Sequence, residues 1–194
     1  QAEYRAVMSS FFLLSQTGVI TLSNKEDSPM PRIRPEEPAD HAAIHDVLMA
    51  AFPTDEEARL VAQLRESGHL KISLVAEDDN QVVGYIGFSP VSAGENDQGL
   101  GLAPIAVVPD RQNEGIGGEL VEAGIAACRD YDAHYVVVLG HSHYYPRCGF
   151  QMASALGYCN EYGASESFMI LPLKPDRMPP PCTIQYGCEF NAWT

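Results

Sequence analysis

Apolar residues recur every three or four positions in two stretches near the beginning of the chain, and this period predicts amphipathic helices. The first helix is expected to follow Asp40, because aspartate readily caps a helix N-terminus. The second is expected to follow Thr54, which stands three positions before Glu57 in the spacing of a capping box, and to end at Gly68. A short strand at 32–34 precedes both helices.

Runs of apolar and β-branched residues predict the strands. Residues 71–76 and 82–88 should pair as a hairpin, because the Asp-Asp-Asn sequence at 78–80 favours a turn. The runs 102–108 and 134–139 are expected to be buried strands, and they should be parallel because a helix lies between them. Further strands are expected at 150–152, 167–173 and 183–186. This order predicts an α/β (α+β) fold with a mixed central sheet flanked by helices.

The first 29 residues do not share this pattern. Two apolar runs, 11–14 and 19–22, flank a polar segment, and together they are too short and too polar for a membrane span of roughly 20 residues. A secretory signal is the weaker alternative, because only Arg5 and the run 11–14 resemble one. We expect residues 1–29 to be an N-terminal extension or leader outside the core, with Met30 as a natural start.

Composition fits one globular domain, with 45% hydrophobic residues in a chain of 194. The net charge of −14 disfavours nucleic acid and anionic membranes as partners, because their phosphates would be repelled. Five cysteines form no Cys-x-x-Cys pair and leave an odd thiol, which favours a reducing compartment over a disulfide framework or a zinc site. We therefore expect a cytoplasmic protein without a bound metal.

A glycine-rich segment follows the apolar run 102–108, with glycines at positions 115, 117 and 118 at the start of an amphipathic helix. Without β-carbons these residues let a ligand approach the backbone, and the unpaired amides of the first helical turn favour anions. The segment predicts a pyrophosphate site; a turn that only lets the helix pack closely on the sheet is the alternative. A dinucleotide fingerprint is excluded because Leu120 replaces its third glycine, and a Walker loop because no Gly-Lys-Ser/Thr follows.

Two motifs carry a resemblance to a known family. The sequence Gln-x-x-Gly-x-Gly over 112–117 resembles the coenzyme A loop of the GNAT acetyltransferase superfamily, and Tyr-Tyr-x-Arg-x-Gly-Phe over 144–150 is similar to a second GNAT segment. The order of predicted elements over 32–174 also resembles this superfamily. The resemblance implies a GNAT domain over 30–174, in which CoA binds where two parallel strands splay apart. Residues 175–194 then form a C-terminal arm that packs on the domain or on a partner subunit, and a homodimer is an associated expectation.

The resemblance implies that the protein transfers the acetyl group of acetyl-CoA, its cosubstrate, to a primary amine of a small molecule. The amine would attack the thioester directly in a ternary complex. The backbone of the central strand would pair with the pantetheine arm, and the glycine-rich loop would hold the pyrophosphate. The residues expected to bind the cofactor are Ile105, Ala106, Val107, Gln112, Asn113, Glu114, Gly115, Ile116, Gly117 and Gly118.

Tyr145 is the expected catalytic residue. Amine attack on a thioester expels a thiolate, and a hydroxyl within hydrogen-bond reach can protonate the departing sulfur. Tyr144 would point about a quarter-turn away on a helix and is expected to pack in the core, while packing is also the alternative for Tyr145. Arg147 is either a surface charge or a ligand of the cofactor phosphates, to which Arg111 is a second candidate.

The general base is not assigned by the sequence. Many GNAT enzymes carry a glutamate on the central strand, but residues 100–108 contain no acid. Glu95, Asp97, His141 and His143 are candidates, each of which is equally compatible with a solvated loop residue. The two histidines give only two ligands and therefore do not predict a metal site.

The acceptor is expected to be cationic, because the chain contains 26 acidic residues and only 12 basic ones. In the GNAT arrangement the acceptor would also enter past the segments 52–57 and 95–97, both of which are acidic. Acidity that serves only solubility is the alternative. Two other function classes stay open at this point: a non-catalytic, acetyl-CoA-binding sensor or regulatory module, and a nucleotide-binding regulatory domain that uses the same glycines.

Overall fold

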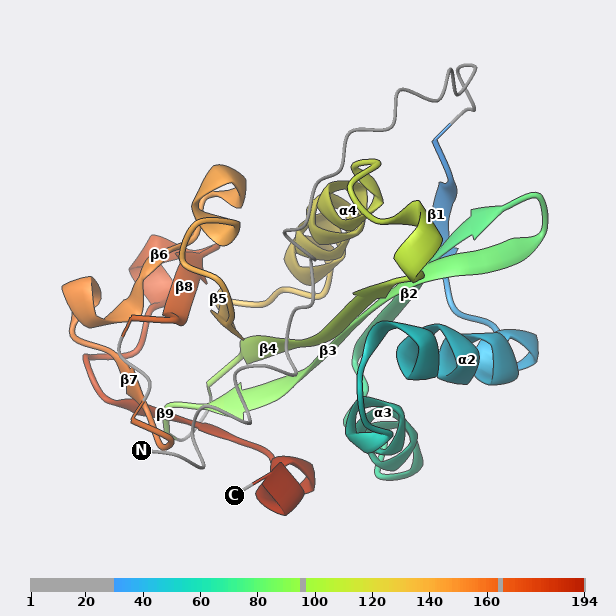
Figure 1. Ribbon diagram of the computed structural model, residues 1–194. Coiled ribbons are helices and arrows are strands. Elements are labelled where there is room, and N and C mark those ends of the chain that lie inside the picture. Colours follow the sequence, from blue (N-terminus) through green and yellow to red (C-terminus); the bar gives the residue numbers. More distant parts are fainter. Residues whose placement is uncertain (1–29, 95–96, 164–165, 194) are drawn as a thin grey trace.

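The computed structural model describes residues 30–94, 97–163 and 166–193, and it contains a mixed sheet with helices on both faces (Figure 1). This is the α/β (α+β) class that the sequence predicts. The α-helices are α2 (His41–Ala51), α3 (Glu56–Glu66) and α4 (Ile116–Asp130). The strands are β1 (Arg32–Pro35), β2 (Ile72–Asp78), β3 (Gln81–Ser92), β4 (Gly99–Val107), β5 (Tyr135–Leu139), β6 (Gln151–Met152), β7 (Cys159–Asn160), β8 (Phe168–Pro172) and β9 (Thr183–Tyr186). Short 3-10 helices are η1 (Pro38–Asp40), η2 (Pro109–Arg111), η3 (Tyr145–Cys148), η4 (Ala153–Leu156), η5 (Pro175–Arg177) and η6 (Cys188–Trp193).

Strands lie in the order β1-β2-β3-β4-β5-β8-β6, and β9 pairs with both β3 and β7. The central neighbours β4 and β5 are parallel, as predicted, because α4 connects them. The predicted β2–β3 hairpin is also present. Its turn contains Asp79 and Asn80 at φ 47° and 61°, a left-handed conformation that these two residue types tolerate better than most.

Helices cover β4 on both faces (Figure 1). Ile105 and Val107 share a buried cluster with α4, whereas Ala106 lies in a cluster with α2 and with Phe52. Every residue of β4 is consequently buried, which explains why this strand is an uninterrupted apolar run without polar alternation.

The N-termini of α2 and α3 differ from the sequence prediction. Asp55 precedes α3 without a side-chain capping bond, so the predicted capping box of Thr54 and Glu57 is wrong. The Glu57 side chain is instead buried, with 0% of its surface exposed. Asp40 precedes α2, but its carboxylate accepts hydrogen bonds from Arg34 and from the Glu37 amide instead of capping that helix.

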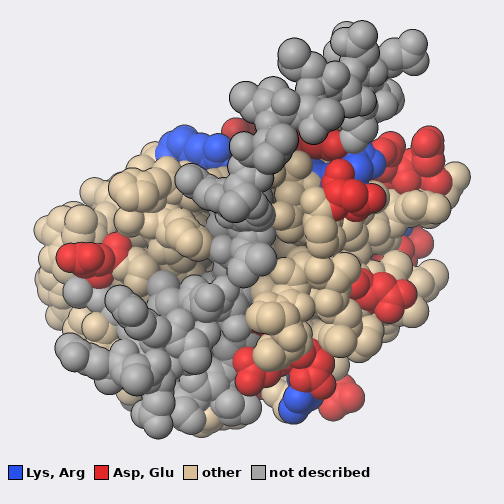
Figure 2. Space-filling view, in the orientation of Figure 1, with Lys and Arg blue, Asp and Glu red and all other residues tan. Residues whose placement is uncertain are grey.

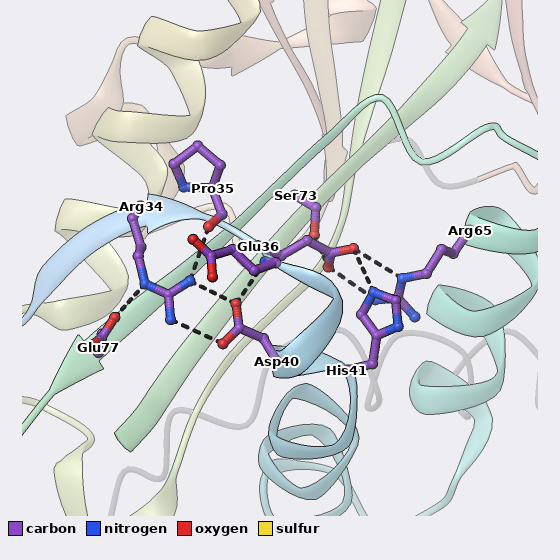
Figure 3. Close-up of polar contacts among 9 residues, drawn as sticks. Arg34, Pro35, Glu36, Asp40, His41, Arg65, Ser73 and Glu77 are labelled. Carbon is purple, nitrogen blue, oxygen red and sulfur yellow. Dashed lines mark hydrogen bonds and ion pairs between the residues drawn. The ribbon is translucent and has the colours of Figure 1, made fainter. Parts of the chain in front are cut away.

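A charged network joins β1 to α2, β2 and α3 (Figure 3). Arg34 donates to Asp40 at 2.6 and 2.9 Å and also pairs with Glu77. Glu36 accepts two hydrogen bonds from Arg65 of α3, both at 2.9 Å, and a third from the Ser73 hydroxyl. Because the Arg65 contact is bidentate, it fixes the rotation of α3 about its axis as well as its position.

The C-terminal residues pack against the same chain. The predicted strand at 183–186 is present as β9, and its last residues pair with Val91 and Ser92 of β3. Phe190 is buried in a cluster with Leu60 and Leu64 of α3. The predicted extension at 1–29 lies outside the described residues. Within the described part of the chain, no helix is long and apolar enough to cross a bilayer.

Candidate functional site

The parallel strands β4 and β5 part before β4 ends. Their register runs from the pair Gly99 and Tyr135 to the pair Leu102 and Val138. At this point β4 contains a bulge, in which Ala103 and Pro104 together oppose one residue of β3. A bulge bends its strand and interrupts pairing, and proline offers no backbone donor. The residues of β4 after the bulge therefore form a strand edge beside β5.

A cavity of about 300 Å³ lies along this strand edge. Its walls come from the end of α2, the second half of β4, the loop before α4, the first turn of α4 and the segment around η3. The lining residues are Ala51, Phe52, Ile105, Ala106, Val107, Arg111, Gln112, Asn113, Gly115, Ile116, Gly117, Gly118, Tyr144 and Arg147. The cavity thus joins an apolar strand edge to the N-terminus of a helix.

The glycine-rich loop has the geometry of an anion site. Gly115 stands at the N-cap of α4 with φ 92°, a conformation that glycine adopts without strain. The amides of Gly118 and Glu119 already bond to the Gly115 carbonyl. The Gln112 side-chain amide donates to the Val107 carbonyl at 3.0 Å and ties the loop to the end of β4. The partial positive charge of the α4 N-terminus therefore points into the cavity from a fixed position.

Arg111 is held in place by two carboxylates. It pairs with Glu114 at 2.7 Å and with Asp78 of the β2–β3 hairpin at 2.6 Å, and these hydrogen bonds raise its pKa. Glu114, which the resemblance assigns to the cofactor, does not line the cavity and instead supports Arg111. All other predicted cofactor-binding residues line the cavity.

Tyr144 and Arg147 form the wall of the cavity opposite the glycines. The Arg147 guanidinium carbon lies 3.7 Å from the centre of the Tyr144 ring, in a cation–π contact. Arg147 itself is exposed, and its guanidinium reaches toward Gly118 at the start of α4. Burial raises the pKa of Tyr144. A cation that reaches toward a helix N-terminus across a cavity suits an anionic ligand.

The positions of the two tyrosines are the reverse of the sequence expectation. Tyr144, expected in the core, lines the cavity, whereas Tyr145 is only 1% exposed and packs in the core cluster with Phe150. The reason is the tight 3-10 turn at η3, which begins at Tyr145 and presses its ring against Gly140, directly after β5. Burial raises the pKa of Tyr145, so its hydroxyl keeps its proton.

Three of the base candidates named from the sequence, Asp97, His141 and His143, are not among the residues that line the cavity. Asp97 accepts hydrogen bonds from the Tyr135 hydroxyl and from the Ala93 amide, at 2.8 Å for the latter, and so supports the loop before β4. His141 and His143 are exposed, and Glu95 lies outside the described residues. Within 30–94, 97–163 and 166–193, no group of three or more metal-ligating side chains is present.

Phe52 and Ala51 are lining residues that the sequence analysis missed. Both belong to the end of α2, where an apolar stripe predicts only core packing. Their contact with the cavity follows from the way α2 crosses β4, and no local sequence signal indicates it.

A parallel strand pair that parts beside a glycine-rich helix N-terminus defines the fold class of the GNAT acyltransferases. A family model described as an acetyltransferase (GNAT) domain matches residues 69–152. The chain is 38% identical over 149 residues to the uncharacterized N-acetyltransferase YhbS of Escherichia coli K12, which is 75% of this chain and 89% of that protein. The chain belongs to the GNAT acetyltransferase family.

Solved structures agree with this assignment. The structure of E. coli YhbS in complex with CoA matches with a TM-score of 0.80 at 34% identity, over 87% of this chain and 96% of that one. A GNAT family acetyltransferase from Brucella melitensis in complex with acetyl-CoA matches with a TM-score of 0.70 at 38% identity, over 82% and 97% of the two chains.

Proposed function

We propose that this protein is an N-acetyltransferase that moves the acetyl group of acetyl-CoA to a primary amine of a small molecule, by direct attack in a ternary complex. The observation that carries the proposal is the cavity between the parted β4 edge and the α4 N-terminus. The strand edge suits an amide-rich arm, and the helix N-terminus suits a diphosphate. Relatives of at least 34% identity were crystallised with CoA or acetyl-CoA, which supports the same cofactor here.

In this proposal the backbone of Ile105, Ala106 and Val107 binds the pantetheine arm, and residues 112–118 bind the pyrophosphate. The Gln112 bond to Val107 supports the second assignment, because it holds the loop at the end of the strand that the arm follows. Arg147 provides a charge beside the same helix end. Arg111, held by two carboxylates, organises the loop.

Tyr145 is proposed as the acid that protonates the departing sulfur. Its ring packs from η3 against Gly140 at the end of β5, the strand that parts from β4, and burial raises its pKa; both observations support a hydroxyl that carries its proton until a thiolate forms. Tyr144 is the competing residue, because it already lines the cavity.

A cationic acceptor is proposed from the distribution of charge. Figure 2 shows acidic side chains around α2 and α3 and on the β2–β3 hairpin, with fewer basic ones among them. The exposed Asp46 and Glu56 contribute to this acidic side. Such a surface attracts amine cations and repels anions.

The free state of all five cysteines supports a reducing, cytoplasmic compartment.

The test is thiol release from acetyl-CoA with a panel of primary amines, together with the thermal shift that acetyl-CoA, CoA, ATP and NAD induce. The proposal expects a thermal shift with acetyl-CoA and CoA alone, and thiol release that depends on the amine. A shift without thiol release would support the second candidate, a non-catalytic acetyl-CoA sensor, which the burial of Tyr145 favours. A homodimer remains a prediction that sedimentation would test.

A further inference from the structure

A second cavity, of about 190 Å³, lies where the C-terminal residues pack on the sheet. Its walls come from the end of α3, the last part of β3, the end of β9 and the start of η6, and we call it the arm cavity. Its lining includes Leu64, His69, Ser89, Gln185, Tyr186 and Glu189. None of these six residues lines the cavity between β4 and α4, so the two cavities are distinct.

The Ser89 hydroxyl is a buried polar group of the arm cavity. The residue is 1% exposed, and among the described residues no group forms a hydrogen bond with its Oγ. Side chains alternate along a strand, so Ser89 faces the same side of the sheet as Val91, which reaches over Gly101 of β4. A buried hydroxyl without a partner costs free energy. A ligand with a polar group would remove this cost.

Glu189 adds a carboxylate to the same cavity. Its side chain is 7% exposed, and its Oε1 accepts hydrogen bonds from the Ser67 hydroxyl at 2.6 Å and from His69 Nδ1 at 2.7 Å. Burial alone would raise the pKa of Glu189, but these bonds outweigh it and the net pKa is lowered. Among the described side chains, only the Cys188 thiol, at 3.8 Å, donates to Oε2. This oxygen can therefore accept a further hydrogen bond.

The arm cavity lies close to the point at which β4 and β5 part. Ser89 pairs with Gly101 of β4, and Leu102 is the last residue of β4 that pairs with β5. Gly101 precedes the bulge residue Ala103 by two positions, which is about 7 Å along a strand. Tyr186 connects the two places, because its ring lies over Gly101 and it packs against the cluster that contains Ala103.

The proposed orientation of acetyl-CoA brings its thioester toward this region. With the pyrophosphate at 112–118 and the pantetheine arm at 105–107, the sulfur end of the arm points along β4 toward Ala103. An amine that attacks there can extend along the same face of the sheet to the arm cavity. The exposed His69 and Gln185 open the cavity to solvent, so an acceptor can enter it.

We propose that the arm cavity binds the second polar group of an acceptor that carries two. One group is the primary amine that is acetylated, and the other is a hydroxyl or a second ammonium that donates to Glu189 and Ser89. This inference rests on the proposed function and deepens it, because it names the substrate class as amino alcohols and diamines. An ionised carboxylate only accepts hydrogen bonds, which suits a donor group and repels a second carboxylate.

The test compares three amines of equal length: an alkylamine, an amino alcohol and a diamine, each over a series of spacers. Thiol release is measured with acetyl-CoA in excess. We expect a higher kcat/KM for the two bifunctional amines once the spacer is long enough to reach the arm cavity. The alkylamine lacks the second group and serves as the internal control for every variant.

Ser89→Ala should raise KM for the two bifunctional amines roughly ten-fold and leave kcat unchanged. The reason is that a contact remote from the reacting atoms is made equally in the bound substrate and in the transition state. Glu189→Gln should raise KM for the diamine by roughly ten- to a hundred-fold, and by less for the amino alcohol, because hydrogen bonds between charged groups are stronger. Neither variant should change the KM of the alkylamine.

Two controls separate binding from a structural role. Ser89→Ala should keep or raise the melting temperature, because the hydroxyl it removes is buried and has no partner among the described residues. Ser154→Ala changes an exposed serine outside both cavities and should leave the KM of all three amines unchanged. A lower melting temperature in Ser89→Ala, with equal losses for all three amines, would make Ser89 structural and overturn the inference.

The remaining outcomes separate the arm cavity from the overall function. Equal parent rates for the three amines at every spacer, or a preference that survives in both variants, would overturn the inference and leave the acetyltransferase proposal intact. If no amine releases thiol, the acetyltransferase proposal fails, and the thermal shift with the diamine decides on the cavity. A rise in melting temperature that Ser89→Ala abolishes would support the cavity as an amine site, and no rise in the parent would overturn it.

Discussion

A β-carbon added to Gly117 would stand 3.1 Å from the hydroxyl oxygen of Tyr144. The first turn of α4 and the segment after β5 thus approach each other across the cavity with room for a glycine and little more. A ligand that contacts the backbone of Gly117 therefore also lies close to this tyrosine. This contact brings the two sequence motifs, 112–117 and 144–150, together in one site.

Replacing Gly117 by leucine should abolish the rise in melting temperature that acetyl-CoA induces, because the side chain would fill the approach to the α4 amides. The fold should be retained, since leucine has a higher helix propensity than glycine. Glu119→Leu is the matched control, because Glu119 is exposed in the same helical turn and does not line the cavity. An undiminished shift in Gly117→Leu would place the cofactor elsewhere.

Tyr145→Phe should keep the acetyl-CoA thermal shift and slow thiol release by roughly a hundred- to ten-thousand-fold, the range for a positioned acid. Tyr144→Phe should do much less, because phenylalanine keeps the aromatic ring on which Arg147 stacks. Steady-state kinetics with one working amine compare the two variants. The reverse order of rates would transfer the acid role to Tyr144, in keeping with its place in the cavity wall.

Acetylation of amine cations should slow as salt is added, whereas acetylation of neutral amines should change little. The acidic side formed by α2 and α3 attracts cations at long range, and salt screens this attraction over about 10 Å at 0.1 M. Initial rates at low and high sodium chloride measure the effect. Rates for cations that do not fall with salt would leave the surface acidity as a solubility feature.

Removal of the Arg65 guanidinium should destabilise the fold. Burial alone would raise the pKa of Glu36, but the hydrogen bonds from Arg65 and Ser73 offset this, and the net pKa is lowered. Arg65→Gln should therefore cost about 1–3 kcal/mol at neutral pH, because a half-buried carboxylate loses its partner. Thermal or urea unfolding measures the loss. Arg59→Gln removes an exposed ion pair with Asp55 and should change stability little. Equal losses of stability in the two variants would show that the pair of Arg65 with Glu36 contributes no more than an exposed pair.

Acid should destabilise the parent through the same network. The hydrogen bond from Arg34 is the main reason that the pKa of Asp40 is lowered, and the pKa of Glu36 is lowered as well. Groups with a lowered folded pKa stabilise above their unfolded values, about 3.9 for Asp and 4.3 for Glu, and lose this contribution as the pH falls further. Melting temperatures across this range should fall less steeply in Arg65→Gln than in the parent. Parallel curves would exclude the Glu36 pair as a cause.

Much of the fold is determined by local sequence. The periods around α2, α3 and α4, the Asp-Asn turn of the β2–β3 hairpin and the apolar runs of β4 and β5 each act over a few residues, so they are visible without a structure. The glycines of 115–118 likewise need only their own backbone conformations to form a helix start that accepts an anion. These signals are sufficient for the class of fold and for most of the cofactor loop.

Tertiary structure decided which side chains meet. Whether Tyr144 or Tyr145 enters the cavity depends on the 3-10 turn that follows β5, and neighbouring tyrosines are alike in sequence. Glu57 has the spacing of a capping residue, yet it is buried on the same face of α3 as Leu60, in a helix that the bond between Arg65 and Glu36 holds in place. Contacts between distant segments set these positions, because a side chain's direction is fixed only when its whole element is docked. The sequence alone therefore determined the helices, the strands and the anion-binding loop. The docking of α3 and η3 on the sheet decided which of their side chains are buried and which line the cavity.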